Sequence, residues 1–279
     1  FLSVGLFSMF VNLLMLTGPV FMLQVYDRVL ASRSEATLVA LVAIVSFLFL
    51  MMGVLDYARG RVLARAGARF QAKLDNRVFE AILRRSVSPV ERARPATGLR
   101  DLESIQRLLS GPAPFAFFDA PWTPIFLLAI FSFHWMLGLL ALGGGLLLIL
   151  LTWLNQRLSK DLQIDANVAA SQSEGFTESV RREGETVQGL GMRKAVLARW
   201  NKLRGESLEK TITASDRTGV FSTASKTLRF FLQSMMLGLG AWLAILGELS
   251  PGMMIAGSIL MGRALAPIEQ AIGQWALVQ

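Results

Sequence analysis

The chain of 279 residues is 53% hydrophobic and only 17% charged, with a formal net charge of +8. Soluble domains carry about 25% charged residues, so this composition excludes an ordinary water-soluble domain and indicates a protein whose surface largely meets lipid. Cysteine is absent and His134 is the single histidine. This excludes disulfide scaffolds and thiolate metal sites, and it leaves little basis for imidazole catalysis. We therefore expect no metal site. We also expect no nucleic-acid partner, because the positive charge lies between apolar blocks, as in membrane proteins.

The apolar residues come in blocks long enough to cross a bilayer. The first block covers residues 1–26, and the second starts at residue 36 after a polar stretch at 27–35. The second block continues without proline to residue 85, with apolar residues at helical spacing such as Leu74, Val78 and Ile82. We predict spans at 1–26 and 36–85. By helical rise the second is about 75 Å long, more than twice the hydrocarbon thickness of about 30 Å.

Two short helices are predicted between the later spans. Ser88, Pro89 and Glu91 have the order of an N-cap, a first-position proline and a capping-box carboxylate, which predicts a short helix at 88–94. After the break at Gly189 and Gly191 a second short helix is expected at 193–200. The remaining spans, with their polar extensions, are predicted at 99–133, 136–187, 201–246 and 251–279.

Charge gives the orientation of these spans. Of the 28 lysines and arginines, 25 lie in residues 56–111 and 155–229, which fall on one side of a six-span topology. The positive-inside rule places these two arms in the cytoplasm. We therefore expect an all-α, multi-pass membrane protein with six transmembrane helices and two long cytoplasmic arms. Because the chain starts inside an apolar run without an initiator methionine, we also expect it to be part of a longer polypeptide.

Six spans, two long arms and a short helix at each tip form a pattern that resembles the transmembrane domain of type I ABC exporters. Four strings are similar to the type I secretion subfamily, the PrtD-like exporters of proteases, lipases and RTX-type proteins. They are LRDLESIQRLLSGP (99–112), FFDAPWTPIF (117–126), VQGLGM (187–192) and LSPGMMIAGSILMGRALAPIEQ (249–270). The last string is the most specific.

The resemblance implies a homodimer in the bacterial inner membrane that works with a periplasmic adaptor and an outer-membrane channel. It implies as cargo an unfolded polypeptide that is secreted in one step. Family members bind ATP and Mg²⁺ in a nucleotide-binding domain after the sixth span. This chain contains no G-x-x-x-x-G-K-S/T phosphate-binding loop, so we expect no ATPase site and no cofactor in it, and an ATP-hydrolysing translocase only as the longer polypeptide.

Family members use the two short helices as coupling helices, which dock into the nucleotide-binding domains. Carried over to this chain, the resemblance makes both arm tips candidates for this motor contact. The candidate residues are Ser88, Glu91, Arg92, Arg94, Met192, Arg193, Lys194 and Trp200. The alternative is that they form a solvated loop.

Three ionisable residues inside predicted spans are candidates for the translocation path: Asp119, Arg263 and Glu269. Charges at membrane depth usually face a cavity or a partner. By helical rise Asp119 and Arg263 lie about 21 Å and about 18 Å from the outer ends of their spans, so we hypothesise that they pair or jointly line the path. A static salt bridge is the alternative. Glu269 lies near the cytoplasmic interface, where it either guards the cargo entrance or extends to the headgroups.

Prolines in two spans are hinge candidates, namely Pro121, Pro124 and Pro267. Plain kinks explain them equally well, because neighbouring helices satisfy the carbonyls that a proline frees. Two functional alternatives also stay open. A lipid or drug exporter has the same fold, and a membrane scaffold or sensor belongs to another class.

Overall fold

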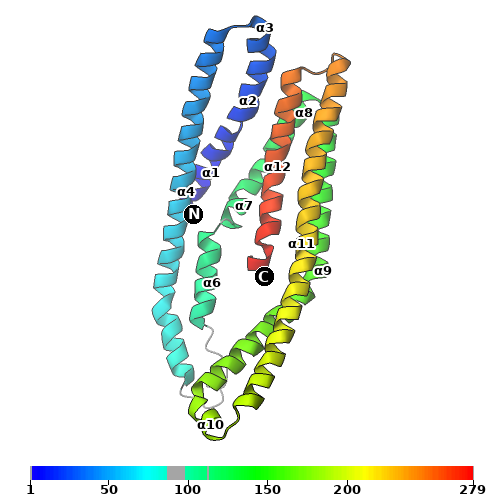
Figure 1. Ribbon diagram of the computed structural model, residues 1–279. Coiled ribbons are helices and arrows are strands. Elements are labelled where there is room, and N and C mark those ends of the chain that lie inside the picture. The colour runs from blue at the N-terminus through cyan, green and yellow to red at the C-terminus, as the bar shows by residue number, and fades with distance from the viewer. Residues whose placement is uncertain (1, 87–97, 112, 279) are drawn as a thin grey trace. The chain divides into compact units, whose positions relative to one another are not determined.

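The computed structural model describes residues 2–86, 98–111 and 113–278, and all the regular structure in these ranges is helical. Within them six helical segments are long and apolar enough to cross a membrane: Ser3–Ser32, Glu35–Arg84, Pro114–Phe133, Trp135–Arg182, Arg193–Ile245 and Pro251–Gln270. The chain divides into two compact units, which we call unit 1 (residues 1–149 and 226–279) and unit 2 (residues 150–225). Helices α9 (Trp135–Arg182) and α11 (Arg193–Ile245), which are labelled in Figure 1, each contain residues of both units.

The first span is a series of short helical segments. α1 (Leu2–Met15) leads into α2 (Thr17–Gln24), the π-helical turn η1 (Val25–Val29) and α3 (Leu30–Ser32). The series ends where Arg33 adopts a left-handed φ of 50°. The helical run therefore passes the expected end at residue 26, because residues 27–32 contain neither proline nor glycine.

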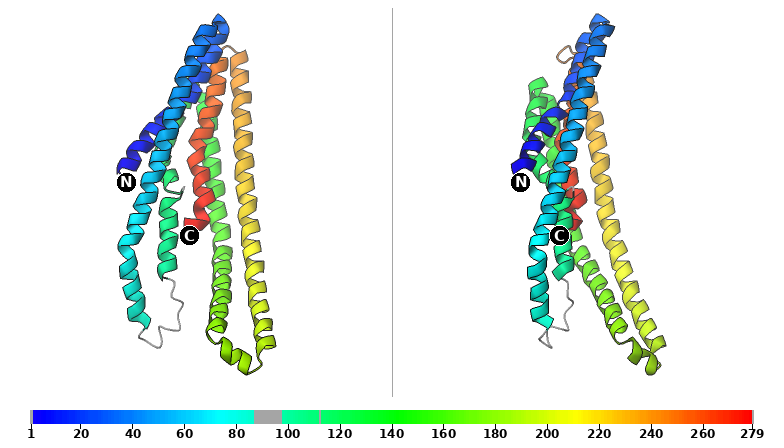
Figure 2. Two further views of the ribbon diagram at one scale, coloured as in Figure 1. Left: turned by 60° about the vertical axis from the view of Figure 1, so that its left-hand side comes forward. Right: turned by 90° about the vertical axis from the view of Figure 1, so that its left-hand side faces the viewer.

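α4 (Glu35–Ser86) is one continuous helix, close to the expected 36–85. The Ser34 hydroxyl accepts a hydrogen bond from the Thr37 N–H at 3.3 Å, which is the usual N-cap contact. α4 packs against α1 and against α6 (Gly98–Ser110), as the two views of Figure 2 show. Gly67 permits close approach to α6, because a Cβ at this position would collide with the Ser110 hydroxyl.

The third span is interrupted. α7 (Ala113–Asp119) is followed by the 3₁₀ turn η2 (Ala120–Trp122) and by α8 (Thr123–Phe133). The turn at His134 has an extended backbone, and α9 (Trp135–Arg182) begins directly after it.

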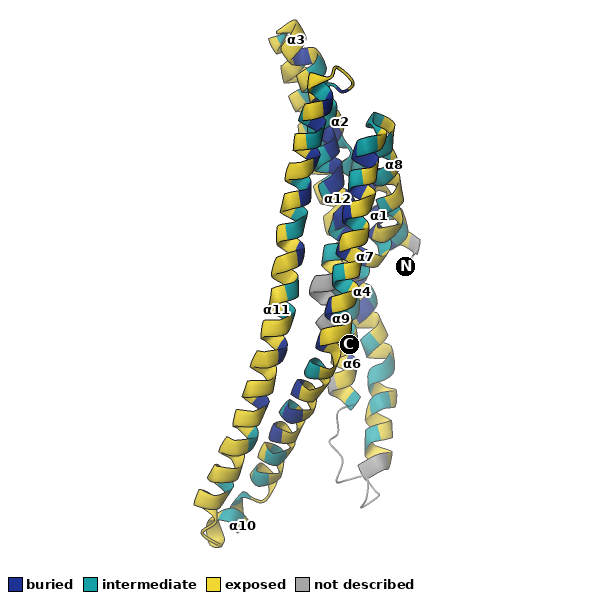
Figure 3. Ribbon diagram, turned by 90° about the vertical axis from the view of Figure 1, so that its right-hand side faces the viewer, coloured by how far each residue is buried: buried dark blue, intermediate teal, exposed yellow. Residues whose placement is uncertain are grey.

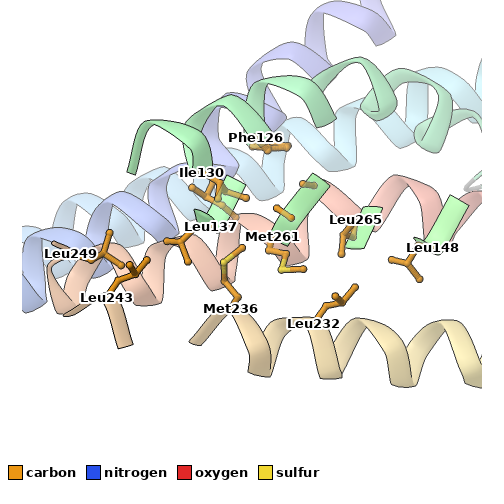
Figure 4. Close-up of a cluster of buried hydrophobic side chains, with 13 residues drawn as sticks. Phe126, Ile130, Leu137, Leu148, Leu232, Met236, Leu243, Leu249, Met261 and Leu265 are labelled. Atoms are coloured by element: carbon orange, nitrogen blue, oxygen red, sulfur yellow. The ribbon is translucent and has the colours of Figure 1, made fainter. Parts of the chain in front are cut away.

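Unit 1 contains the apolar core of the protein. α12 (Pro251–Val278) contacts α2 on one side and α8 on another. Its inner face joins side chains from α8, α9 and α11 (Arg193–Ile245) in one cluster, shown in Figure 4. The cluster includes Phe126, Ile130, Leu137, Leu148, Leu232, Met236, Leu243, Leu260, Met261 and Leu265. Gly144 provides space for this packing, because a Cβ there would lie 2.7 Å from a methyl group of Leu232.

Unit 2 is an antiparallel helical pair closed by a short helix. Residues 150–182 of α9 and 193–225 of α11 are joined through α10 (Gly184–Gly189). Gln163 donates a hydrogen bond to the Thr218 hydroxyl at 3.2 Å across the pair. Apart from Asn155, the buried positions carry small side chains: Ser159, Ala166, Ala169, Ser173, Ser207, Ala214 and Ser225. In Figure 3 such buried positions interrupt the otherwise exposed length of α11.

The second short helix lies earlier in the chain than expected. Residues 193–200 form the first turns of α11, because neither proline nor glycine interrupts the helix start there. The short helix is α10, which follows a break at Glu183. The expected helix at 88–94 lies outside the described residues.

Candidate translocation and coupling sites

Asp119 lies at the break in the third span. It is the last residue of α7, and the next three residues form the 3₁₀ turn η2. Pro121 is in the first turn of η2 and Pro124 in the first turn of α8. At a helix start the missing proline N–H removes no intrahelical bond. The two prolines therefore mark the starts of short helical segments, and neither kinks the interior of a continuous helix.

The partner of Asp119 is Arg59 of α4. Arg59 Nη1 lies 2.8 Å from Asp119 Oδ1, and the Arg59 side chain is only 5% exposed. The same nitrogen donates to the Ser8 hydroxyl at 2.8 Å, and Nη2 donates to Asp56 at 2.8 Å. Asn12 donates a second hydrogen bond to Asp119 Oδ1 at 2.7 Å. One buried polar cluster therefore connects α1, α4 and α7.

Within the described chain Asp119 therefore pairs with Arg59 and not with Arg263, and a joint role of Asp119 and Arg263 in lining a path stays a prediction. Arg263 is exposed on α12 within this single chain, whereas Asp119 is buried against Arg59. Depth within the predicted spans does not identify Arg59 as the partner, because Arg59 falls in segment 56–111, which is expected to form a cytoplasmic arm. By helical rise Arg59 lies about 36 Å along α4 from its start, which is close to the inner membrane boundary.

The buried ion pair of Arg59 and Asp119 has most of the hydrogen bonds that such a pair needs for stability. Removing two charges from water costs several kcal/mol each, and only good geometry with further hydrogen bonds offsets this. Arg59 has three hydrogen-bond acceptors and lies 4.3 Å from the centre of the Phe115 ring. Its Nε lacks a hydrogen-bond partner among the described residues. The arrangement fixes the relative position of three helices at one point.

The other charged residues of the predicted path lie on α12. Glu269 Oε1 is 2.8 Å from Arg229 Nε of α11, with both side chains about a quarter exposed. The contact lacks hydrogen-bond geometry, so it is an electrostatic pair. Pro267 is buried inside α12, and the Thr123 hydroxyl donates to the Ala264 carbonyl at 3.2 Å in the turn before it. Asp119 is thus paired with Arg59 and Glu269 with Arg229, and no ion pair among the described residues joins Asp119, Arg263 and Glu269 to one another.

A polar contact also joins the outer ends of the first and sixth spans. Asp27 in η1 accepts hydrogen bonds from the Ser250 hydroxyl at 2.6 Å and the Gly252 N–H at 3.0 Å. A Cβ at position 252 would lie 2.7 Å from the Asp27 carboxylate, so a larger residue there would displace this side chain from its hydrogen bonds. His134, in the turn between α8 and α9, lies close to Glu248, in the turn between α11 and α12. The distance from His134 Nε2 to Glu248 Oε2 is 3.2 Å.

The tip of unit 2 exposes apolar side chains. Between α10 and α11 the chain turns at Gly191, whose φ is +64°, a conformation that favours glycine. Leu190 is 68% exposed and Met192 is 47% exposed. Arg193 and Lys194 are exposed in the first turn of α11. These neighbouring apolar and basic side chains make the tip a candidate docking surface.

Trp200 has a different place from the other predicted tip residues. Its indole Nε1 donates to the Thr177 hydroxyl of α9 at 3.1 Å. It therefore holds the two helices of unit 2 together beside the tip. The other four predicted coupling residues, Ser88, Glu91, Arg92 and Arg94, lie outside the described residues.

The six apolar spans and the polar contacts between them define a multi-pass helical membrane domain. The model for the ABC transporter transmembrane region matches residues 1–266, so the chain belongs to this family. It is 40% identical over 275 residues to the type I secretion system ATP-binding protein PrsD of Rhizobium meliloti (strain 1021), which covers 99% of this chain and 47% of that protein. The family is one of transporters, so the expected alternative of a sensor or scaffold is not retained.

More distant relatives point the same way. The Toxin RTX-I translocation ATP-binding protein of Actinobacillus pleuropneumoniae is 27% identical, with 99% of this chain and 39% of that protein covered. A solved bacterial Atm1-family ABC exporter with ATP bound has a TM-score of 0.81 at 16% identity, with 99% of this chain and 50% of that chain covered. This last match confirms the exporter fold. The chain spans about half or less of the length of each of these relatives.

Proposed function

We propose that this chain is the membrane-spanning domain of an ATP-driven exporter that secretes a polypeptide from the bacterial cytoplasm through a type I secretion system. The observation that carries the proposal is the 40% identity, over nearly the whole chain, to a type I secretion protein. The relatives are named as ATP-binding proteins, and they extend beyond the matched region. ATP and Mg²⁺ would therefore bind in a nucleotide-binding domain of the longer polypeptide.

The proposed assembly is a homodimer in the inner membrane, with a periplasmic adaptor and an outer-membrane channel as further partners. Arg263 supports a path role for α12, since an exposed arginine within a span needs a polar neighbour. In this proposal Arg263 and Glu269 face the cargo route on α12. Asp119 acts indirectly, as a positioning residue that holds the break in the third span. That break and Pro267 are the points at which the spans bend.

Coupling is assigned to the arm tips, including Ser88–Arg94 and the α10–α11 turn. Leu190 and Met192 are exposed apolar residues at the end of a helical arm, and burial of such residues at a protein interface is favourable. Docking of this turn on a nucleotide-binding domain would connect ATP binding to movement of α9 and α11.

The proposal is tested with Leu190→Asp/Met192→Asp in the full-length exporter, expressed with its adaptor, channel and cognate secreted protein. We expect secretion to fall by about 5- to 150-fold, the range of typical coupling free energies, with basal ATP hydrolysis retained. Ser171→Asp/Gln172→Asp is the control, because it adds two charges at exposed positions of α9. Unchanged secretion in the tip variant would refute the coupling assignment.

Cargo class is tested separately by reconstituting the wild-type protein in vesicles. ATP-dependent movement of the secreted polypeptide supports the proposal. Stimulation of ATP hydrolysis by lipid or a hydrophobic drug, with no response to any polypeptide, would replace it with the other exporter class of the same fold.

A further inference from the structure

α4 carries a regular row of positive charges beyond its apolar part. Arginine or lysine occurs at every fourth residue from 61 to 77, and all five side chains are exposed. We call these residues the α4 cation row: Arg61, Arg65, Arg69, Lys73 and Arg77. Residues four apart are neighbours on a helix surface. The row is therefore a continuous charged ridge about 24 Å long by helical rise.

The charges of the row are not neutralised within the described part of the chain. The ion pairs of α4 there use Arg59 and Arg84 with acidic partners. In the row, Arg61 contacts only the hydroxyl and ring of Tyr57. Like charges four residues apart destabilise an isolated helix, so an anionic partner would relieve a repulsion that the fold leaves in place.

One flank of the row is open. Ala64, Ala68 and Ala72 each precede a cation of the row, and all three are exposed. Their methyl groups form a second, low ridge beside the long basic side chains. A chain lying on these alanines would reach the charged groups without displacing any bulky neighbour.

Lipid headgroups account for only part of the row. By helical rise from Glu35, Arg61 lies about 39 Å along α4 and Arg77 about 63 Å. A bilayer with its headgroups is about 40–45 Å thick. Lys73 and Arg77, about 57 Å and 63 Å along the helix, therefore lie more than a Debye length of about 8 Å beyond an anionic membrane surface, in the cytoplasmic part of the helix.

The spacing fits an extended polypeptide. Successive cations are about 6 Å apart along the helix axis, and side chains on one side of an extended strand recur about every 6.6–6.8 Å. The row also winds around α4 by about 40° per step. An unfolded segment follows this winding, whereas a rigid folded surface meets only part of it.

We propose that the α4 cation row binds an acidic, extended segment of the exported polypeptide on the cytoplasmic side. The identity of this partner rests on the proposed function. Several exposed ion pairs, each weak alone, would hold the segment with strong salt dependence. Such contacts let a moving chain exchange one acidic side chain for the next.

The test uses the full-length protein in nanodiscs of phosphatidylcholine, without ATP. The probe is a fluorescent peptide of about ten residues that alternates Glu and Ser, long enough to cover the row when extended. A peptide that alternates Gln and Ser is the neutral control. The row variant is Arg65→Gln/Arg69→Gln/Lys73→Gln/Arg77→Gln, and binding is followed by anisotropy.

A matched variant removes the same charge from unit 2. Lys202→Gln/Arg204→Gln/Lys210→Gln/Arg217→Gln changes four exposed cations of α11. We expect the row variant to lose about tenfold or more in affinity, as four weak ion pairs would give, and the α11 variant to lose about twofold or less. Equal loss in both variants, or no loss in either, overturns the proposal. If the wild-type protein loses its affinity for the acidic peptide when phosphatidylglycerol is added to the nanodiscs, the row is a lipid site, and the proposal is overturned.

Export assays separate this proposal from the proposed function. Normal polypeptide export by the row variant, with unchanged peptide binding, refutes the role of the row and leaves the exporter function intact. Binding of the acidic peptide by the row in a protein that exports no polypeptide refutes the exporter function and, with it, the identity of the bound segment as cargo.

Discussion

Unit 1 and unit 2 bury different kinds of side chain. The core of unit 1 is made of large apolar residues such as Leu137, Met236 and Leu260, whereas unit 2 buries Ser173, Ala214 and similar small residues. In lipid, apolar burial is not driven by water, and helices associate through close van der Waals packing. In unit 2 the small side chains instead let two helices approach closely. We therefore expect unit 1 to be destabilised when a buried side chain is made smaller, and unit 2 to be destabilised when a buried side chain is made larger.

The largest effect is expected at the buried Arg59–Asp119 ion pair of unit 1. Arg59→Leu leaves Asp119 buried without its cation, which should lower the stability of the protein by about 3–5 kcal/mol. The measurement is thermal or denaturant unfolding of the full-length protein in detergent. Arg59→Leu/Asp119→Leu removes both charges and should recover most of the loss. If the double variant were no more stable than Arg59→Leu, the loss of stability would not come from leaving Asp119 without its cation.

The next effect tests the packed interface between α9 and α11 in unit 2, which we call the seam. Ala214 is buried in α11, and Ala214→Leu should destabilise by about 1–3 kcal/mol because it overpacks the helix pair. Proteolysis of the arm reports the loss locally. Ser215→Leu, at an exposed neighbour, should have little effect. If both substitutions were tolerated equally, the seam would not be closely packed.

Shortening a buried side chain tests how closely the apolar core of unit 1 is packed. Leu260→Ala should cost about 1–2 kcal/mol, the packing part of the cost typical of water-soluble cores. Leu146→Ala is the matched control, because Leu146 is exposed on α9 and should show almost no change in the unfolding midpoint. Equal losses would mean that the buried cluster is loosely packed.

The smallest effect is expected on the surface of unit 2. Arg181 is exposed and lies 2.8 Å from Glu178. Exposed pairs of this kind contribute little, so Arg181→Ala should not measurably change stability. A clear loss in the unfolding midpoint would show that this surface is covered in the assembled protein, and repeating the measurement at high salt would test whether charge is responsible.

The sequence predicts the spans better than the contacts between them. Block length and charge distribution are enough to place six spans, because the bilayer constrains both. The long helix α4 follows from an apolar stripe without proline. The true ends of the first span and of the second short helix depend on local turns at Arg33 and Glu183, which carry weak signals.

The partner of Asp119 was missed although a signal was present. Arg59 lies four residues before Leu63 and eight before Gly67, and all three are buried on one stripe of α4. An arginine on an apolar stripe needs an acidic partner in the interior. Ser8 and Asn12, one turn apart in the first span, were the other unexplained polar residues. Their meeting depends on helix packing, which no local pattern specifies.

The contact of Asp27 with the start of α12 has a thermodynamic consequence. It consists of two charge-assisted hydrogen bonds, each of which contributes about 1.5–3 kcal/mol. That total is comparable to the few kcal/mol by which two conformations of one protein commonly differ. The joint is thus strong enough to keep the outer ends of these spans together most of the time. It is also weak enough to separate and re-form repeatedly without unfolding the helices on either side.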